Sequence, residues 1–334
     1  MYKILTRSRG VKLVEFYNQN NFHVILSNYG ASIYEIDMED RNGEAEVITL
    51  SPQSAYYFSK EKYAGLTVGR TAGRIKDAEF EVDGVTYKFN ANDRGNLLHG
   101  GDKSMAFKFF DYTIDDNDEE TIVTYSTYIK DMEDGFPGNL EVKVIYTLKK
   151  LVNQIQLEFK AYSDKDTMLN LTNHSYFNLY GNLKRTIENH VLTLNKNYIS
   201  KMDETQALLY NEPVSKEYDF RKPKEIGQDL RSEKVMSSCG GYDDCWTDSK
   251  PLRLNLYDKE SGRNMEIESN YHDVVIYTNN MVNNITYISG VNDSQYLAVA
   301  IEPSRASKAI TKKDMIQKAR QLYDKYIIYK FTIR

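Results

Sequence analysis

The chain has 334 residues, of which 41% are hydrophobic and 27% are charged. That length and balance suffice to bury a substantial core. The formal net charge is −5, and a weakly acidic chain is a poor candidate for binding nucleic acid or an anionic membrane surface. No apolar run of about 18 residues is present, so we expect no transmembrane helix, and the polar segment 1–10 does not resemble a signal peptide.

The chain contains two cysteines, Cys239 and Cys245. Their spacing matches no zinc or redox motif, and a single possible pair does not make a disulfide framework. We therefore expect a protein of the reducing cytoplasm.

Turn signals and alternating apolar residues mark the first part of the chain. Asn42-Gly43 predicts a tight turn, and the composition of residues 53–63 is compatible with a short helix. Asp83-Gly84 lies between the alternating stretches Phe80–Val82 and Val85–Phe89. This pattern predicts a β-hairpin, because Asp-Gly accepts the positive φ angles that a two-residue hairpin turn requires.

Longer alternating stretches follow. Apolar residues occupy every second position in Glu141–Leu148 and in Gln154–Lys160, which is the period of half-buried antiparallel strands. Residues 296–302 alternate in the same way, and Pro303 is expected to end that strand. Asp314–Tyr323 has the composition of a helix but no clean apolar stripe.

No repeat and no linker divides the chain. Residues 1–334 are therefore predicted to form a single all-β domain, a large antiparallel β-sandwich with few short helices. The sequence has no phosphate-binding glycine loop, no Gly-x-Ser-x-Gly elbow and no histidine pair with metal-ligand spacing, so we expect no metal and no cofactor. Acid and base side chains are the remaining candidates for chemistry.

His174 is the first candidate for proton transfer. If residues 170–178 are extended, alternation places His174 on a polar face with Thr172 and Tyr176. An unperturbed histidine has a pKa of about 6.5, which suits proton transfer near neutral pH. A structural histidine satisfied by its polar neighbours is the competing interpretation.

Glu302 and His99 are two further candidates. Glu302 shares its strand face with Ala298 and Ala300, whose small side chains leave room for a ligand. His99 precedes two glycines, which is typical of a tight turn where a ligand or another backbone segment approaches closely. The alternatives are a solvated strand end for Glu302 and an ordinary loop position for His99.

Three charged residues are candidates for holding a ligand. Arg70 and Arg74 flank Gly73, and an arginine fork binds adjacent sugar hydroxyls or pairs with a carboxylate. Asp243 follows Gly240-Gly241-Tyr242, where turn chemistry alone is a sufficient explanation.

The order of these motifs along the chain resembles the aldose 1-epimerase (galactose mutarotase) family. The matching motifs are Asn28-Tyr29-Gly30-Ala31-Ser32-Ile33, Gly69-Arg70-Thr71-Ala72-Gly73-Arg74-Ile75, Leu98-His99-Gly100-Gly101, Gly135-Phe136-Pro137-Gly138, Asn173-His174-Ser175-Tyr176-Phe177-Asn178-Leu179, Tyr277-Thr278-Asn279 and Glu302. The similarity extends from about residue 20 to residues 329–331. Any one motif could arise by chance, but the full set in the family's order makes the resemblance specific.

The resemblance implies a galactose mutarotase-like β-sandwich and an isomerase that interconverts the α and β anomers of free aldoses such as galactose or glucose. It implies Glu302 as the catalytic base, His174 as the catalytic acid and His99 as a second active-site histidine. Arg70 and Asp243 match substrate-binding positions. The expected partner is a small-molecule aldose, with no nucleic acid and no membrane, and the expected assembly is a monomer or homodimer.

The chain departs from the family pattern near these positions. Asp244 stands where the family often has histidine, Trp246 stands where phenylalanine is usual, and Pro303-Ser304-Arg305 replaces the residues that commonly follow the glutamate. Their effect on specificity, and so the preferred aldose, stays open at this point, as does the choice between monomer and homodimer.

Three other functions stay open as well. A non-catalytic sugar-binding protein would use the same arginine, aspartate and aromatic residues, although binding alone does not need the acid and base set. A hexose-phosphate mutarotase of the same fold requires a basic cluster at the pocket mouth, for which Arg305 and Lys308 are candidates. A glycoside hydrolase would pair Glu302 with Asp243 but would leave the histidines unexplained.

Overall fold

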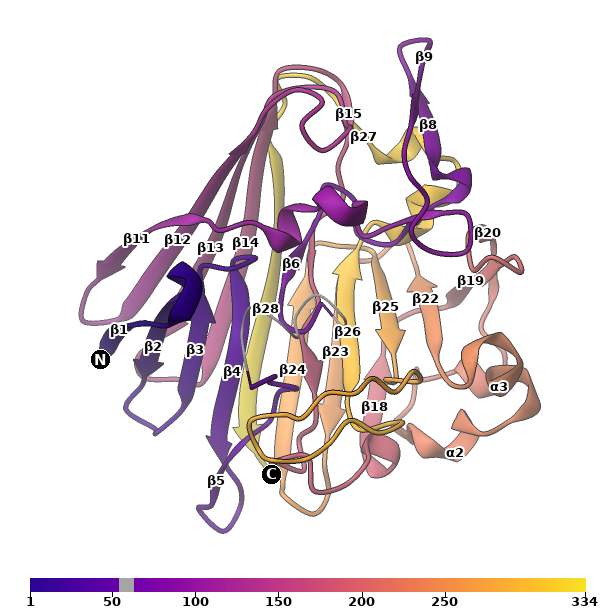
Figure 1. Ribbon diagram of the computed structural model, residues 1–334. Coiled ribbons are helices and arrows are strands. Elements are labelled where there is room, and N and C mark those ends of the chain that lie inside the picture. The colour runs from indigo at the N-terminus through magenta and orange to yellow at the C-terminus, as the bar shows by residue number, and fades with distance from the viewer. Residues whose placement is uncertain (54–62) are drawn as a thin grey trace.

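The computed structural model describes residues 1–53 and 63–334. Within these residues the strands form three main antiparallel sheets and four short two-stranded ladders (Figure 1). The five-stranded sheet has the spatial order β1 (Tyr2–Thr6), β2 (Lys12–Tyr17), β3 (His23–Ser27), β4 (Ser32–Glu39) and β5 (Ala45–Val47). The six-stranded sheet has the order β17 (Tyr176–Phe177), β26 (Val299–Ser304), β25 (Asp273–Tyr277), β22 (Asp243–Thr247), β19 (Tyr198–Met202) and β20 (Leu208–Pro213).

The largest sheet has nine strands among the described residues. Its order is β11 (Asp111–Asp116), β12 (Glu120–Ile129), β13 (Leu140–Lys149), β14 (Gln154–Ser163), β28 (Tyr323–Ile333), β24 (Arg263–Ser269), β23 (Leu252–Tyr257), β18 (Val191–Leu194) and β21 (Lys224–Glu225). Strand β28 thus lies between two strands that precede it in the chain. The two-stranded ladders pair β7 (Arg74–Ile75) with β10 (Leu97–Leu98), β6 (Thr67–Val68) with β16 (Thr172–Asn173), β15 (Thr167–Met168) with β27 (Ile316–Gln317), and β8 (Glu79–Val82) with β9 (Val85–Lys88).

One hydrophobic core joins the three main sheets. Fully buried side chains from the five-stranded sheet (Phe16), the nine-stranded sheet (Tyr146, Tyr329) and the six-stranded sheet (Trp246, Ile301) belong to the same cluster. The nine-stranded sheet therefore forms one layer of a β-sandwich, and the two smaller sheets pack against it, as Figure 1 shows. This arrangement confirms the predicted all-β antiparallel sandwich.

The predicted turns and the alternating strands over 141–148 and 154–160 are confirmed. Strands β13 and β14 alternate buried and partly exposed residues along most of their length. The hairpin of β8 and β9 turns at Asp83-Gly84 with positive φ angles of 52° and 76°. Gly43, with φ 84°, donates its backbone N–H to the Asp40 carbonyl at the turn between β4 and β5.

Helices are few and short. The described α-helices are α2 (Gly227–Leu230) and α3 (Glu233–Cys239). None of the helices in the described part of the chain is long and apolar enough to cross a membrane. The helix that the sequence suggested near residues 53–63 falls largely outside the described residues.

The segment Asp314–Tyr323, whose composition is that of a helix, does not form an α-helix. A 3₁₀ turn (Lys313–Met315) leads into β27, and β28 begins at Tyr323. Met315 is fully buried in a cluster beneath the β8–β9 hairpin, and β27 pairs with β15. The burial of Met315 and the pairing of β27 with β15 outweigh the helical composition of this segment. The segment has no apolar stripe that would stabilise a helix against the core.

Strand boundaries also differ from the prediction in β26 and in the segment that carries His174. The strand predicted over 296–302 begins only at Val299. Pro303 lies inside β26, opposite Val274 of β25. Proline has no backbone N–H to donate to a neighbouring strand. It is tolerated there because β17 pairs with β26 only at residues 299–300, so no hydrogen bond to β17 is lost. Residues 170–178 are not one extended strand. They contain β16 and β17, which pair with different parts of the chain, and β15 precedes them with a third partner.

Candidate active site

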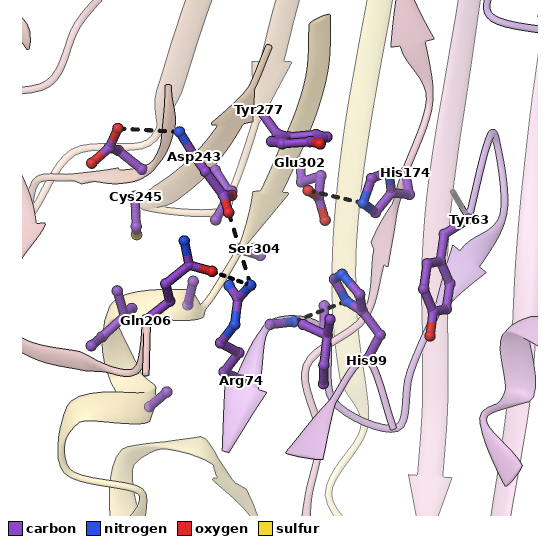
Figure 2. Close-up of a pocket in the computed structure, with 18 of the residues that line it drawn as sticks. Tyr63, Arg74, His99, His174, Gln206, Asp243, Cys245, Tyr277, Glu302 and Ser304 are labelled. Carbon is purple, nitrogen blue, oxygen red and sulfur yellow. Dashed lines mark hydrogen bonds and ion pairs between the residues drawn. The ribbon is translucent and has the colours of Figure 1, made fainter. Parts of the chain in front are cut away.

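A cavity of about 160 Å³ opens on the face of the six-stranded sheet that points away from the core. It collects side chains from segments that are far apart in the sequence (Figure 2). The polar and aromatic residues that line it include Tyr63, Arg74, His99, His174, Tyr176, Gln206, Asp243, Asp244, Tyr277, Glu302 and Ser304. Four of the five predicted site residues are among them.

Strand register builds the floor of this cavity. Glu302 on β26 lies directly across from Val275 on β25, and Val275 lies across from Cys245 on β22. The neighbouring row carries Tyr277 and Asp243, which are paired in the same way. Because alternate residues of a strand share a face, these side chains point into the cavity while Ile301 and Ile276 between them enter the core.

Glu302 and His174 form a buried acid–base pair. Nε2 of His174 lies 3.3 Å from Oε1 of Glu302, and both residues are about 5% exposed or less. Burial, together with the nearby Asp243 carboxylate and against the opposing charge of Arg74, raises the pKa of Glu302 to about 8. The glutamate is therefore a much stronger base than an exposed carboxylate, which suits it to proton transfer near neutral pH.

The chain holds His174 through its backbone. His174 follows β16, its N–H donates to the Leu66 carbonyl at 2.9 Å, and its own carbonyl accepts from Gly65 at 3.0 Å. The imidazole ring packs against Tyr176, with 5.0 Å between ring centroids. These contacts fix the position of the His174 imidazole relative to Glu302.

His99 lies beside this pair as a neutral imidazole. Its ring meets that of His174 edge-on at 5.3 Å, and Tyr63 packs at 4.8 Å. Burial, followed by the neighbouring His174 and Arg74 charges, holds the pKa of His99 well below its usual 6.5. Nδ1 accepts the Gly73 backbone N–H at 3.2 Å, so the neutral ring carries its hydrogen on Nε2 and is a hydrogen-bond donor there.

Arg74 and Asp243 form the polar wall opposite the histidines. Arg74 bonds Asp93 through Nε at 2.6 Å. It bonds Gln206 through Nη2 at 2.8 Å, and its Nη2 lies 3.9 Å from Oδ2 of Asp243 (Figure 2). Burial raises the pKa of Asp243 even though Arg74 opposes it. This wall presents a guanidinium, a carboxyl and an amide, the groups that bind sugar hydroxyls.

Arg70, which the sequence assigned to ligand binding, does not line this cavity. Its side chain is fully buried, its Nε pairs with Asp134 at 2.8 Å, and its Nη1 donates to the carbonyls of Pro137 and Gly138. The guanidinium is engaged in holding the 134–138 loop. Arg74, four residues further on, takes the position in the cavity.

The departures from the family pattern divide between the cavity and the core. Asp244 lines the cavity, and burial followed by the Asp243 charge raises its pKa to about 7. Ser304 lines the cavity two residues beyond Glu302. Trp246 instead packs in the core with Tyr218 and Tyr242 and is 1% exposed.

Some lining residues carried no recognisable sequence signal. Gln206 lies in the connection between β19 and β20, where neither periodicity nor a motif marks it. Tyr277 stood in a matched motif and alternates toward the cavity, so its strand period was the available clue.

His99, His174 and Glu302 each offer one metal-ligand atom, all within 4.8 Å of one another, so this trio is also where a metal ion could bind.

Known proteins resemble this chain in both sequence and fold. A family model described as Aldose 1-epimerase matches residues 12–330. The galactose mutarotase of Bos taurus is 29% identical over 326 residues, which cover 94% of this chain and 92% of that relative. The galactose mutarotase of Rattus norvegicus is 32% identical over 270 residues, which cover 79% of this chain and 76% of that relative.

Solved structures agree in fold. An aldose epimerase homologue from C. elegans superposes with a TM-score of 0.86 at 23% identity, covering 100% of this chain and 99% of the other. A galactose 1-epimerase from Lactobacillus acidophilus superposes with a TM-score of 0.85 at 24% identity, covering 100% and 98%. These likenesses define a galactose mutarotase-like β-sandwich.

The chain belongs to the aldose 1-epimerase family. It is therefore an enzyme of the isomerase class that acts on carbohydrates.

Proposed function

We propose that this enzyme interconverts the α and β anomers of a free aldose, such as galactose or glucose, by acid–base ring opening and reclosure. The observation that carries the proposal is the buried pair at the cavity floor, with 3.3 Å between Nε2 of His174 and Oε1 of Glu302. Opening a cyclic hemiacetal requires a base at the C1 hydroxyl and an acid at the ring oxygen. Both oxygen atoms are bonded to C1, so a base and an acid that lie close together can reach them at the same time.

The steps follow from this placement. The Glu302 carboxylate takes the proton of the C1 hydroxyl while the His174 imidazolium donates a proton to the ring oxygen. The bond between C1 and the ring oxygen breaks, which leaves an open-chain aldehyde. Rotation about C1–C2 presents the other carbonyl face, and the reverse transfers reclose the ring. Positioned acid and base groups each contribute about 10²–10⁴-fold.

The surrounding residues support this transfer. His99, as a neutral Nε2–H donor, stabilises charge that develops near the ring oxygen. Arg74, Gln206 and Asp243 bind hydroxyls away from C1, and this hold must leave C1 free to rotate. Among these groups Arg74 takes the place that the sequence assigned to Arg70.

Polarimetry on freshly dissolved α-galactose and α-glucose tests the proposal. Glu302→Gln and His174→Asn are expected to lower kcat by about 10²–10⁴-fold. Tyr198→Phe, an exposed side chain at the far end of the same sheet, serves as the matched control and keeps the wild-type rate. Near-normal rates in either site variant contradict these roles.

The same measurement separates the rival functions. A protein that binds the sugar without accelerating the change in rotation is a sugar-binding protein. Faster conversion of glucose 6-phosphate than of glucose identifies a hexose-phosphate mutarotase. Arg305, a candidate for its phosphate cluster, does not line the sugar cavity, which favours the free sugar.

A further inference from the structure

A second cavity, of about 470 Å³, lies at the end of the six-stranded sheet beyond Glu302. Its walls come from the segment that leads into β25, the end of β26, the start of β28 and the loop before β28. The residues that line it with a titratable or charged side chain or a hydroxyl are Tyr271, His272, Asp273, Ser304, Arg305, Tyr323, Asp324 and Lys325. Ser304 lines this cavity and the sugar cavity, so the two are neighbours.

Lys325 occupies an unusual position in β28. Tyr323, Ile327 and Tyr329 share its strand face, and all three are buried in the core. Alternation therefore directs the lysine inward, and its Nζ lies 5.4 Å from the centroid of the buried Tyr271 ring. Among the residues that the structure describes, no carboxylate or other acceptor bonds this ammonium group.

Arg305 brings a second cation to the same cavity. Its Nη2 donates to the Asp314 backbone carbonyl at 2.5 Å, and no described carboxylate pairs with it. Burial, followed by the charge of Arg305, lowers the pKa of Lys325, and the Asp324 carboxylate opposes this shift. Neighbouring cations repel each other, and a bound anion relieves that repulsion.

The acidic residues at this cavity offset the two cations only in part, because Asp324 raises the pKa of Lys325 by less than Arg305 lowers it. Asp273 accepts a hydrogen bond from Thr247 at 2.6 Å, and Lys196 is among its charged neighbours. Asp324 is exposed on the opposite face of β28 from Lys325. The Ser304 hydroxyl is buried and has no hydrogen-bond partner among the described residues, which leaves one further donor for a ligand.

We propose that the second cavity binds the phosphate group of a small molecule, held by Lys325, Arg305 and the Ser304 hydroxyl. Lysine, an arginine fork and a hydroxyl together match the charge and acceptor atoms of a phosphate. The cavity is larger than a phosphate ion and lies in the size range of small-molecule sites, so a phosphorylated metabolite fits it as well as inorganic phosphate. Of its three donors, only Ser304 also lines the sugar cavity.

Calorimetric titration with inorganic phosphate at constant ionic strength tests the proposal. We expect saturable binding in the wild type, and Lys325→Met, which keeps the apolar stem and removes the charge, is expected to weaken it by about tenfold or more. Lys330→Met is the matched control, because Lys330 lies on the same strand, outward, beside Glu268, and its loss leaves binding unchanged. Wild-type affinity in Lys325→Met, or no binding of phosphate at all, overturns the proposal.

A second titration identifies the source of the phosphate. Glucose 6-phosphate is added with excess galactose present, so that the sugar cavity is occupied. Tighter binding than inorganic phosphate assigns the site to a phosphorylated sugar, and equal binding assigns it to the phosphate group alone. The melting temperature of Lys325→Met shows that the variant folds, and its glucose mutarotation stays at the wild-type rate because Lys325 does not line the sugar cavity.

Discussion

Arg70 and Arg74 are four residues apart in the sequence, and their side chains enter different environments. Arg70 is fully buried on Asp134 and two backbone carbonyls, whereas Arg74 reaches the sugar cavity beside Asp243. The burial of Arg70 therefore assigns it to stability, and the proposed function assigns Arg74 to substrate binding.

Substitution of each arginine by methionine tests this division. Arg70→Met leaves the buried Asp134 carboxylate unpaired, so we expect a loss of about 3–5 kcal/mol in the free energy of unfolding, measured in urea. Arg74→Met removes a charged donor from the cavity, so kcat/KM is expected to fall about 10–100-fold in a protein of nearly normal stability. An unchanged kcat/KM in Arg74→Met would falsify its binding role.

The charges around Glu302 set the pH at which it becomes a base. The Asp243 carboxylate raises the pKa of Glu302 and Arg74 lowers it. Removing the negative charge in Asp243→Asn favours ionised Glu302. The acidic limb of the pH profile of kcat/KM is therefore expected to move to lower pH by up to about one unit. Arg74→Met is expected to move the same limb to higher pH. Shifts in the same direction for both variants, or no shift, would show that the limb does not report Glu302.

At the scale of elements, short ladders position the histidines. His99 follows β10, and its backbone N–H donates to the Gly73 carbonyl at 3.0 Å just before β7. Gly100, directly after it, has φ 80°, and an added Cβ would lie 2.6 Å from the Gly69 carbonyl oxygen. The imidazole is therefore held by a backbone segment that has no room for a side chain.

Gly100→Ala is expected to shift His99 and lower kcat, with a loss of about 1–3 kcal/mol in stability. Gly84→Ala in the β8–β9 hairpin is the matched control, because Gly84 has a similar φ of 76° but nothing within 4 Å of the added Cβ. The control is expected to lose about 1 kcal/mol and keep its kcat. Equal kcat values in the two variants would mean that His99 tolerates the displacement.

The sequence was most informative about elements with a clear period. Strands β13 and β14 and the β8–β9 hairpin follow from alternation and Asp-Gly chemistry. The segment 167–178 could not be predicted, because its three short pairings are each with a distant partner. Motif order predicted that Glu302, His174, His99 and Asp243 lie together, and all four line the same cavity. Arg74 was not separable from Arg70 by pattern, since what distinguishes them is the Asp134 partner, 60 or more residues away.

At the scale of the whole molecule, a buried neutral histidine makes stability depend on pH. His190 is 1% exposed, its Nε2 accepts the Leu179 backbone N–H at 2.8 Å, and burial lowers its pKa to about 4. The unfolded chain binds a proton at His190 below about pH 6.5, whereas the folded chain does so only near pH 4. Stability from this residue is therefore present above pH 6.5 and is lost as pH falls toward 4.

His190→Gln tests this linkage, because the glutamine oxygen accepts the Leu179 N–H and does not titrate. The wild type is expected to lose on the order of 3 kcal/mol more than the variant between about pH 6.5 and 4, measured by urea unfolding at a series of pH values. Parallel curves for the two proteins would assign the acid sensitivity to other groups.

The place of β28 has a consequence for how the chain is made. Residues 323–333 close the gap between β14 and β24, both of which leave the ribosome earlier. Roughly 160 residues separate β14 from β28, so at about 5–20 residues per second the edge of β14 stays open for on the order of ten to thirty seconds. Open edges recruit strands from other chains. The yield of folded protein then depends on protection of the nascent chain during that interval. Chaperones, or slow encounters between chains, provide this protection.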